Sequence, residues 1–205
     1  WRLILAGSAG RDIERLPGKY ATAIGAEANA SGNFSTALGK YASASGNYST
    51  AVGKYASASG VASSAFGYGA HATGTASTAL GVDANAAGSG SIAEGVFASA
   101  AADNSIAVGY HASAQGYASA AFGNNATAVG DSGIAIGNTS MAGTYATAVG
   151  PFAVAQGYSS VALGDTANAL SDNSVAIGKN AYVAPTGQVG NYYSGYSSVP
   201  TQGIA

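Results

Sequence analysis

The sequence predicts an all-β fold, a parallel β-roll (solenoid) whose coils are fourteen residues long. A glycine ends a segment such as STALG (35–39) or SVAIG (174–178) once in each period, and a second glycine follows about halfway in most periods. Side chains before each segment-ending glycine also alternate with a period of two. A fixed short period indicates one small structural unit that is stacked many times. The segment-ending glycines, called the timing glycines, are Gly25, Gly39, Gly53, Gly67, Gly81, Gly95, Gly109, Gly123, Gly137, Gly150, Gly164 and Gly178.

The segment before each timing glycine is predicted to be a β-strand. In the coil that ends at Gly39, Thr36 and Leu38 lie on one face, and Ser35 and Ala37 lie on the other. A period of two is typical of a strand, and both faces are apolar enough to be buried. A helix is disfavoured because a glycine in a helix interior costs about 1 kcal/mol, and glycine here recurs about every seven residues.

A second strand is predicted after each timing glycine. In the segment 42–45, alanine alternates with serine, which gives one dry face and one wet face. Two strands and two corners complete a coil, and equivalent strands of stacked coils lie about 4.8 Å apart. We expect the glycines to supply the positive φ angles of the corners. Where Ala102 or Ser171 replaces the halfway glycine, an Asp-Asn pair follows, so we expect the corner to move onto Asn104 or Asn173.

The composition excludes several classes of function. Only 8% of the 205 residues are charged and the formal net charge is −2, so a basic surface for nucleic acid or for an anionic membrane is not expected. Cysteine is absent, which removes disulfides and thiolate metal sites. No stretch approaches the roughly twenty strongly apolar residues of a membrane-spanning helix. We predict no cofactor and no metal.

The repeats divide the chain into three parts. Residues 20–179 hold the repeats, and residues 1–19 contain four of the seven basic residues and are expected to be a cap or an adjoining segment. Residues 180–205 are rich in Pro, Gly and Tyr and are expected to be a C-terminal segment or an insert. The chain begins with Trp1 and has no secretion signal, so we interpret it as a fragment of a longer protein.

Self-association is expected because one coil is too thin to cover all of its apolar faces. A continuous apolar stripe marks an interaction surface, and parallel rods associate around their long axis by cyclic symmetry. The periodicity alone does not choose between two and three subunits. The large residues of the stripe are Ile24, Leu38, Val52, Phe66, Leu80, Val108, Phe122, Ile136, Val149, Leu163 and Ile177.

Two segments carry a resemblance to a known family. DNSIAVG (103–109) and DNSVAIG (172–178), each with a Ser/Ala strand seven residues on, resemble the YadA-like head of trimeric autotransporter adhesins. The resemblance implies a left-handed parallel β-roll and an intertwined homotrimer. It also implies display on the surface of a Gram-negative bacterium, with a coiled-coil stalk and an outer-membrane barrel that lie C-terminal to this chain.

The function that the resemblance implies is that of a non-enzymatic adhesin head. Its expected partners are host extracellular matrix proteins such as collagen, or like adhesins on other cells, and the alternative is a structural spacer without a ligand. In the family, NSVAIG-type segments form the inner strands of the trimer and are tied to matrix binding. Most other copies here have Thr where the motif has Val, and they lack the Asn. The matching residues are Asn104, Ser105, Ile106, Ala107, Val108, Gly109, Asn173, Ser174, Val175, Ala176, Ile177 and Gly178.

Aromatic residues near the corners are further candidates for ligand contact. Tyr41, Tyr55 and Tyr110 follow timing glycines, while Phe34 and Tyr48 follow halfway glycines. Aromatic side chains supply much of the energy at binding hot spots. The alternative is that they cover the corners or pack between neighbouring subunits.

The titratable residues give no sign of catalysis. His71 and His111 occupy different positions in their coils, and the aspartates Asp83, Asp103, Asp131, Asp165 and Asp172 are spread along corners, where we interpret them as turn residues. Glu94 occupies a position that is apolar in the other coils. It is expected either to form a buried ion or water site or to be turned outward by a local bulge, because burying an unpaired carboxylate is costly.

Other solenoid classes fit the repeat less well. A polysaccharide-cleaving β-helix needs clustered acidic or basic residues in a groove, and a hexapeptide-repeat acyltransferase advances by six residues rather than by seven. An ice-binding solenoid displays rows of Thr-x-Thr, whereas Thr36, Thr50 and Thr78 stack singly here. We therefore predict that the chain is not an enzyme.

Overall fold

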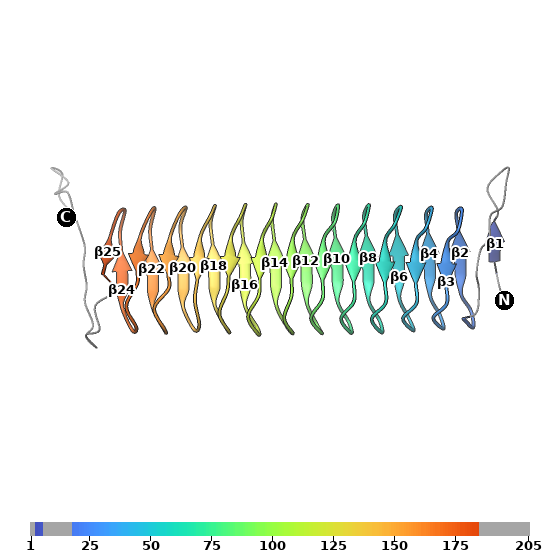
Figure 1. The fold of residues 1–205 in the computed structure, drawn as a ribbon, viewed down its shortest axis with the longest axis horizontal. Helices are drawn as coiled ribbons and strands as arrows, with labels where there is room; N and C mark the ends of the chain where they lie inside the picture. The colour runs from blue at the N-terminus through green and yellow to red at the C-terminus, as the bar shows by residue number, and fades with distance from the viewer. Residues whose placement is uncertain (1–2, 6–17, 185–205) are drawn as a thin grey trace, which may run out of the picture.

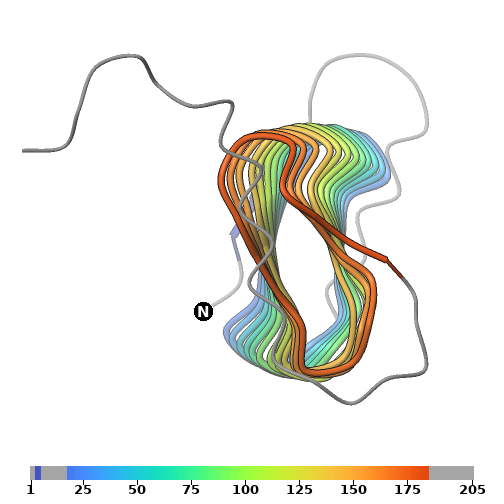
Figure 2. The same ribbon diagram turned by 90° about the vertical axis from the view of Figure 1, so that its left-hand side faces the viewer.

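The computed structural model describes residues 3–5 and 18–184 and shows an elongated stack of short coils (Figure 1). The described residues form strands and turns and contain no helix. Seen along the stack, successive coils superimpose as a flattened loop that rotates gradually from one end to the other (Figure 2). The predicted all-β parallel solenoid is confirmed. Most of the predicted N-terminal segment 1–19, and residues 185–205 of the predicted C-terminal segment, lie outside the described residues.

Two parallel sheets run along the stack, one of thirteen strands (sheet A) and one of twelve (sheet B). Sheet A contains, in spatial order, β1 (Leu3–Leu5), β2 (Thr22–Ile24), β4 (Thr36–Leu38), β6 (Thr50–Val52), β8 (Ser64–Phe66), β10 (Thr78–Leu80), β12 (Ile92–Glu94), β14 (Ile106–Val108), β16 (Ala120–Phe122), β18 (Ile134–Ile136), β20 (Thr147–Val149), β22 (Val161–Leu163) and β24 (Val175–Ile177). Sheet B contains β3 (Asn29–Ala30), β5 (Ser43–Ala44), β7 (Ser57–Ala58), β9 (His71–Ala72), β11 (Asn85–Ala86), β13 (Ser99–Ala100), β15 (Ser113–Ala114), β17 (Thr127–Ala128), β19 (Met141–Ala142), β21 (Val154–Ala155), β23 (Asn168–Ala169) and β25 (Tyr182–Val183).

The strands pair in the register of the sequence repeat. In sheet A, for example, Leu38 pairs with Val52, fourteen residues further along the chain. A one-residue deletion shortens the spacing between Gly137 and Gly150, yet Ile134 still pairs with Thr147. The deletion lies in the corner 143–146, so the sheets continue through it unchanged.

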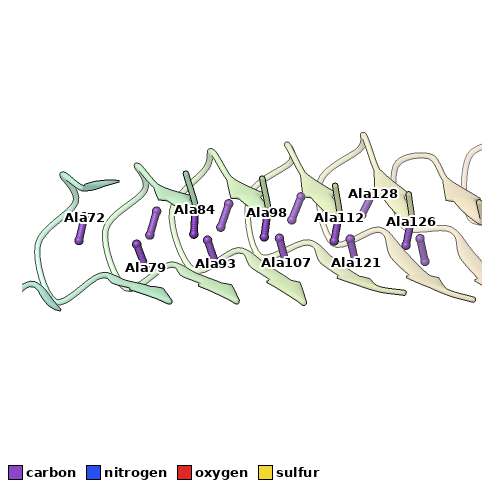
Figure 3. Packing of buried hydrophobic residues seen from close by; sticks show 14 of the residues in the cluster. Ala72, Ala79, Ala84, Ala93, Ala98, Ala107, Ala112, Ala121, Ala126 and Ala128 are labelled. Atoms are coloured by element: carbon purple, nitrogen blue, oxygen red, sulfur yellow. The ribbon is translucent and has the colours of Figure 1, made fainter. Parts of the chain in front are cut away.

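Alanine fills the interior of every coil. Ala37 from sheet A and Ala42 and Ala44 from the sheet B side are completely buried, and the same pattern recurs along the stack. Alanines from the two sheets point toward one another across the narrow interior (Figure 3). A gap that is filled by methyl groups has no room for a larger side chain, so close packing requires small residues on this face.

The large aliphatic residues point away from this interior. The prediction that both faces of the first strand are buried is wrong for the single chain, because Leu38 is 41% exposed while Ala37 is fully buried. The reason is steric, since only the Ser/Ala face fits between the two sheets. The dry and wet faces predicted for the second strand are confirmed, because Ala44 is buried and Ser45 is exposed.

Each corner is a tight turn with one left-handed residue that is usually not glycine. The N–H of Ala42 donates to the carbonyl of Gly39 at 3.1 Å, and the N–H of Ser49 donates to the carbonyl of Gly46 at 3.3 Å. The third residue of each turn, Tyr41 or Tyr48, has a φ of 60°, as in a type II turn.

The two kinds of glycine have different structural roles. The timing glycines have φ between 114° and 137°, which confirms the predicted positive φ. The halfway glycines have no positive φ, so that prediction is wrong for them. A Cβ on Gly46 would lie 2.0 Å from the carbonyl oxygen of Gly60, so the close approach of the next coil favours glycine there. Asn104 and Asn173 are left-handed as predicted, but their corners have not moved, because every coil has its left-handed residue at this place.

Buried serines close the corners from inside. The Ser77 hydroxyl donates to the carbonyl of Gly74 at 2.7 Å, and most of the equivalent serines make the same bond. The Ser91 hydroxyl lies at the same position in the next coil, is equally buried and has no hydrogen-bond partner.

Alanine variants of these two serines separate the contribution of the hydrogen bond to stability from the cost of burying the hydroxyl. We expect Ser77→Ala to destabilise the protein by about 1 kcal/mol, because a buried hydrogen bond is lost. Ser91→Ala should leave stability unchanged or raise it, because an unsatisfied hydroxyl is removed. Thermal unfolding of the two variants at equal concentration measures the difference. Equal losses from both would show that the bond contributes nothing.

Candidate ligand-binding and assembly surfaces

The outer face of sheet A is the longest apolar surface among the described residues. Two columns of side chains point outward from it, one from the first and one from the third residue of each strand. The first column changes along the stack, from Thr or Ser in β2 to β10 to mainly Ile, Val and Ala from β12 onward. The third-residue column is Ile24, Leu38, Val52, Phe66, Leu80, Glu94, Val108, Phe122, Ile136, Val149, Leu163 and Ile177.

The two motif segments cross both the interior and the outer face. Ile106 and Val108 are half-buried on the outer face of sheet A, with Val175 and the exposed Ile177 at equivalent positions. Their neighbours Ser105, Ala107, Ser174 and Ala176 are fully buried in the coil, where they do not reach an external ligand.

The ends of the motifs form corners. Asn104 and Asn173 are left-handed turn residues with φ of 57° and 56°, and Gly109 and Gly178 have φ of 134° and 114°. Within the motifs, the outward aliphatic pairs and the corner asparagines are therefore the groups open to a partner.

Glu94 is exposed on the outer face of sheet A, between Leu80 and Val108 in the strand register. The strand that contains it, β12, pairs regularly with β10 and β14, so the predicted bulge is absent. The predicted outward orientation is confirmed, but its cause is different. The whole column points outward because the interior accepts only small residues.

Aromatic residues gather at the corner that follows the timing glycines. Tyr41 and Tyr55 stack in parallel with ring centroids 5.2 Å apart, and Tyr68 meets Tyr55 edge-on at 5.7 Å. Tyr110 lies apart from this cluster and contacts Phe97 at 6.4 Å. Tyr110 is the second residue of its turn whereas Tyr41 and Tyr55 are the third of theirs, and Asp83 occupies the third position in an intervening coil.

Charged side chains surround the first of these clusters. The Nζ of Lys40 lies 5.0 Å from the ring centroid of Tyr41, and the Nζ of Lys54 lies 4.9 Å from that of Tyr55. Glu27 hydrogen-bonds the Tyr41 side chain, and this bond together with the negative charge of Glu27 raises the pKa of Tyr41. The tyrosine hydroxyl therefore stays protonated, and a hydrogen-bond donor, throughout the neutral pH range.

A second aromatic stack lies at the opposite corner. Tyr20, Phe34 and Tyr48 stack at centroid distances of 5.0 and 5.1 Å, and all three are exposed. Phe34 and Tyr48 were predicted from the sequence as candidate contact residues, whereas Tyr20 was not. Their fourteen-residue spacing is the signal that could have found it.

The aspartates act as turn residues, as predicted. The Oδ1 atoms of Asp103, Asp131 and Asp172 accept backbone N–H bonds from the preceding coil at 2.7 to 2.8 Å. Asp83 is a left-handed corner residue with a φ of 52°. Asp165 forms an exposed ion pair with Lys179 at 3.5 Å.

The remaining titratable groups do not converge. His71 is exposed on sheet B, whereas His111 lies at a corner and stacks on Phe97 at 4.8 Å. Residues 3–5 and 18–184 contain no group of three or more His, Cys, Asp or Glu side chains that could hold a metal ion. In the same part of the chain, no helix is long and apolar enough to span a bilayer.

A stack of similar coils with long exposed faces defines a solenoid whose exposed surface is its functional part. The profile of the YadA head domain repeat matches residues 17–42, 39–56, 44–70, 58–84, 72–98, 86–112, 113–140, 142–165 and 155–181. These matches cover most of the chain, which therefore belongs to the YadA head family. Membership in this family supports an adhesin role for the chain, because the family is one of adhesins rather than of enzymes.

Solved structures include a similar protein from Yersinia. The crystal structure of the collagen-binding domain of the Yersinia adhesin YadA is 26% identical, and the match covers 87% of this chain and 82% of that chain. The TM-score of the pair is 0.40. None of the curated proteins compared with the sequence matches it.

Proposed function

We propose that the chain is the head of a trimeric surface adhesin that binds extracellular matrix proteins, with collagen as the first candidate. The observation that carries the proposal is the repeated solenoid surface of a YadA head, which continues through the described coils. Regions outside this chain would hold the head at the bacterial surface. The proposal includes the left-handed winding that is expected of the family.

The outer face of sheet A is the proposed subunit interface. It exposes large aliphatic and aromatic residues such as Leu38, Phe66 and Ile177 in one column that only Glu94 interrupts. Apolar surfaces of this length on soluble proteins mark interaction sites. Three copies arranged by cyclic symmetry around the long axis would each present the same face to the centre.

The proposed ligand surface is what such a trimer leaves outside. The corner cluster of Tyr41, Tyr55, Lys40 and Lys54 combines exposed rings with positive charges. Tyrosine gives large contact area together with a hydrogen-bonding group, which suits it to protein surfaces. Three copies of a weak site on a fixed frame gain avidity without any strong single contact.

Solid-phase binding tests the ligand. Wells coated with collagen, other matrix proteins or the adhesin itself are probed with the purified chain, and light scattering gives its mass. Binding to matrix protein by a trimer supports the proposal. A trimer that binds none of them would make the head a spacer, and binding only to itself would make it a cell-to-cell adhesin.

The Tyr41–Tyr55 corner is predicted to contribute to binding. We expect the double variant Tyr41→Ala and Tyr55→Ala to weaken matrix binding at least about tenfold, because two exposed rings are lost from each subunit. The matched control is Phe34→Ala with Tyr48→Ala, which removes a stacked aromatic pair from left-handed positions at the opposite corner. Similar losses of binding by both variants would show that the effect comes from disturbing the corners rather than from removing this site.

A further inference from the structure

Glu94 is the one charged side chain in the two outward columns of β2 to β24. The other members of these columns are Thr, Ser, Ala, Val, Ile, Leu or Phe. The single chain leaves Glu94 exposed, so its carboxylate is hydrated there. The same carboxylate would lose water if another subunit covered the face.

The strands around Glu94 contain nothing to compensate its charge. Leu80 and Val108 flank it in the register, and Ile92 precedes it on the same face. Strands β10, β12 and β14 contain no other titratable residue, and neither do β11 and β13 of sheet B. Within the described part of the chain, the side chain of Glu94 makes no hydrogen bond or ion pair.

Symmetry would bring three such groups to one level. Cyclic symmetry places equivalent residues of all subunits at the same height along the axis. Three carboxylates at one level in an apolar interface are opposed by desolvation and by mutual repulsion. Protonation removes both costs.

We propose that Glu94 makes assembly of the head proton-linked: the trimer holds this carboxyl in its neutral form, and loss of the proton weakens the subunit interface. The inference rests on the proposed homotrimer through sheet A. Burial in the trimer favours the neutral carboxyl over the carboxylate.

The sign of the pH dependence follows from this preference. A proton that the trimer binds more tightly than the free chain stabilises the trimer at low pH, and this stabilisation is lost as pH rises. A roughly tenfold difference in proton affinity per subunit would weaken the trimer about a thousandfold for three subunits.

The test compares the unaltered chain with Glu94→Gln, whose neutral amide imitates the protonated carboxyl. Analytical ultracentrifugation gives the trimer dissociation constant of each between pH 4.5 and 8. We expect the ratio of the two constants to be smallest at pH 4.5 and to rise with pH, because only the unaltered chain acquires the charge. Glu27→Gln is the matched control, since Glu27 lies at a corner outside sheet A and its variant should follow the unaltered chain.

Other outcomes separate this inference from the proposed function. Trimers whose dissociation constants keep the same ratio at every pH would overturn the role of Glu94 and leave the homotrimer standing. Monomers at all pH values would overturn both. Calcium that tightens the unaltered trimer at pH 8, but not Glu94→Gln, would show that the carboxylates bind a cation instead of a proton. The histidines titrate in the same range, but they are present in both proteins and cancel in the ratio.

Discussion

Gly109→Ala is expected to prevent stable folding of the coils around it. Gly109 has a φ of 134°, a conformation that costs a residue with a side chain about 1–3 kcal/mol. A Cβ would also lie 2.4 Å from the carbonyl oxygen of Gly123 in the next coil. Because that oxygen belongs to the backbone of the stack, it cannot move aside without disturbing the pairing of the sheets. The combined loss should exceed about 4 kcal/mol.

Gly178→Ala is the matched control, because it separates backbone conformation from steric conflict. Gly178 has a φ of 114°, and a Cβ there would meet no atom within 4 Å. We expect its variant to lose only the conformational part, about 1–3 kcal/mol. Thermal unfolding followed by circular dichroism compares the two at equal concentration. Equal losses of stability would mean that backbone conformation alone, without steric conflict, explains why glycine is needed at the timing positions.

The repeat made the fold predictable from sequence, because fourteen residues with two alternating stretches allow few arrangements other than a parallel stack. The interior was harder to assign. Leu38 is more hydrophobic than Ala37, so hydrophobicity alone favours burial of both. The space between the sheets decides the matter, since it fits alanine but not leucine. The distance between the sheets is set by the closed coil and cannot be read from the alternation of residues in the sequence.

The halfway glycines show the same limit. Gly46 and Gly39 look equivalent in the sequence, yet only Gly39 has a positive φ. The sequence marks both positions as needing a small residue, and only the position of the next coil shows that Gly46 avoids a contact. The left-handed residue is Tyr48, which no sequence preference for glycine or asparagine would have selected.

The candidate site was predictable in part. Residues spaced by fourteen stack on one another, so Tyr41 and Tyr55 meet as their spacing implies. Tyr110 lies several coils further along, and the intervening corner that contains Val82 and Asp83 has no aromatic side chain to continue the cluster. Membership in the motif was a weaker guide, because alternate residues of a strand face the closed interior whatever their role in the family.

The location of the proposed subunit interface can be tested with two similar residues that lie on different sheets. Ile136 on sheet A is 41% exposed in the single chain, and Val129, beside β17 of sheet B, is 44% exposed. Both are aliphatic, and their similar exposure means that aspartate at either place would be hydrated in a monomer. Only an interface on sheet A would bury the charge of Ile136→Asp.

We therefore expect Ile136→Asp to dissociate the proposed trimer while Val129→Asp leaves it intact. An unpaired charge buried in an apolar interface costs at least about 2 kcal/mol per subunit, which for three subunits is roughly four orders of magnitude in the dissociation constant. Sedimentation velocity over a range of concentrations measures the change, and circular dichroism checks that the coils stay folded. Dissociation by Val129→Asp alone would place the interface on sheet B. Trimers that tolerate both substitutions would show that neither outer face holds the subunits together.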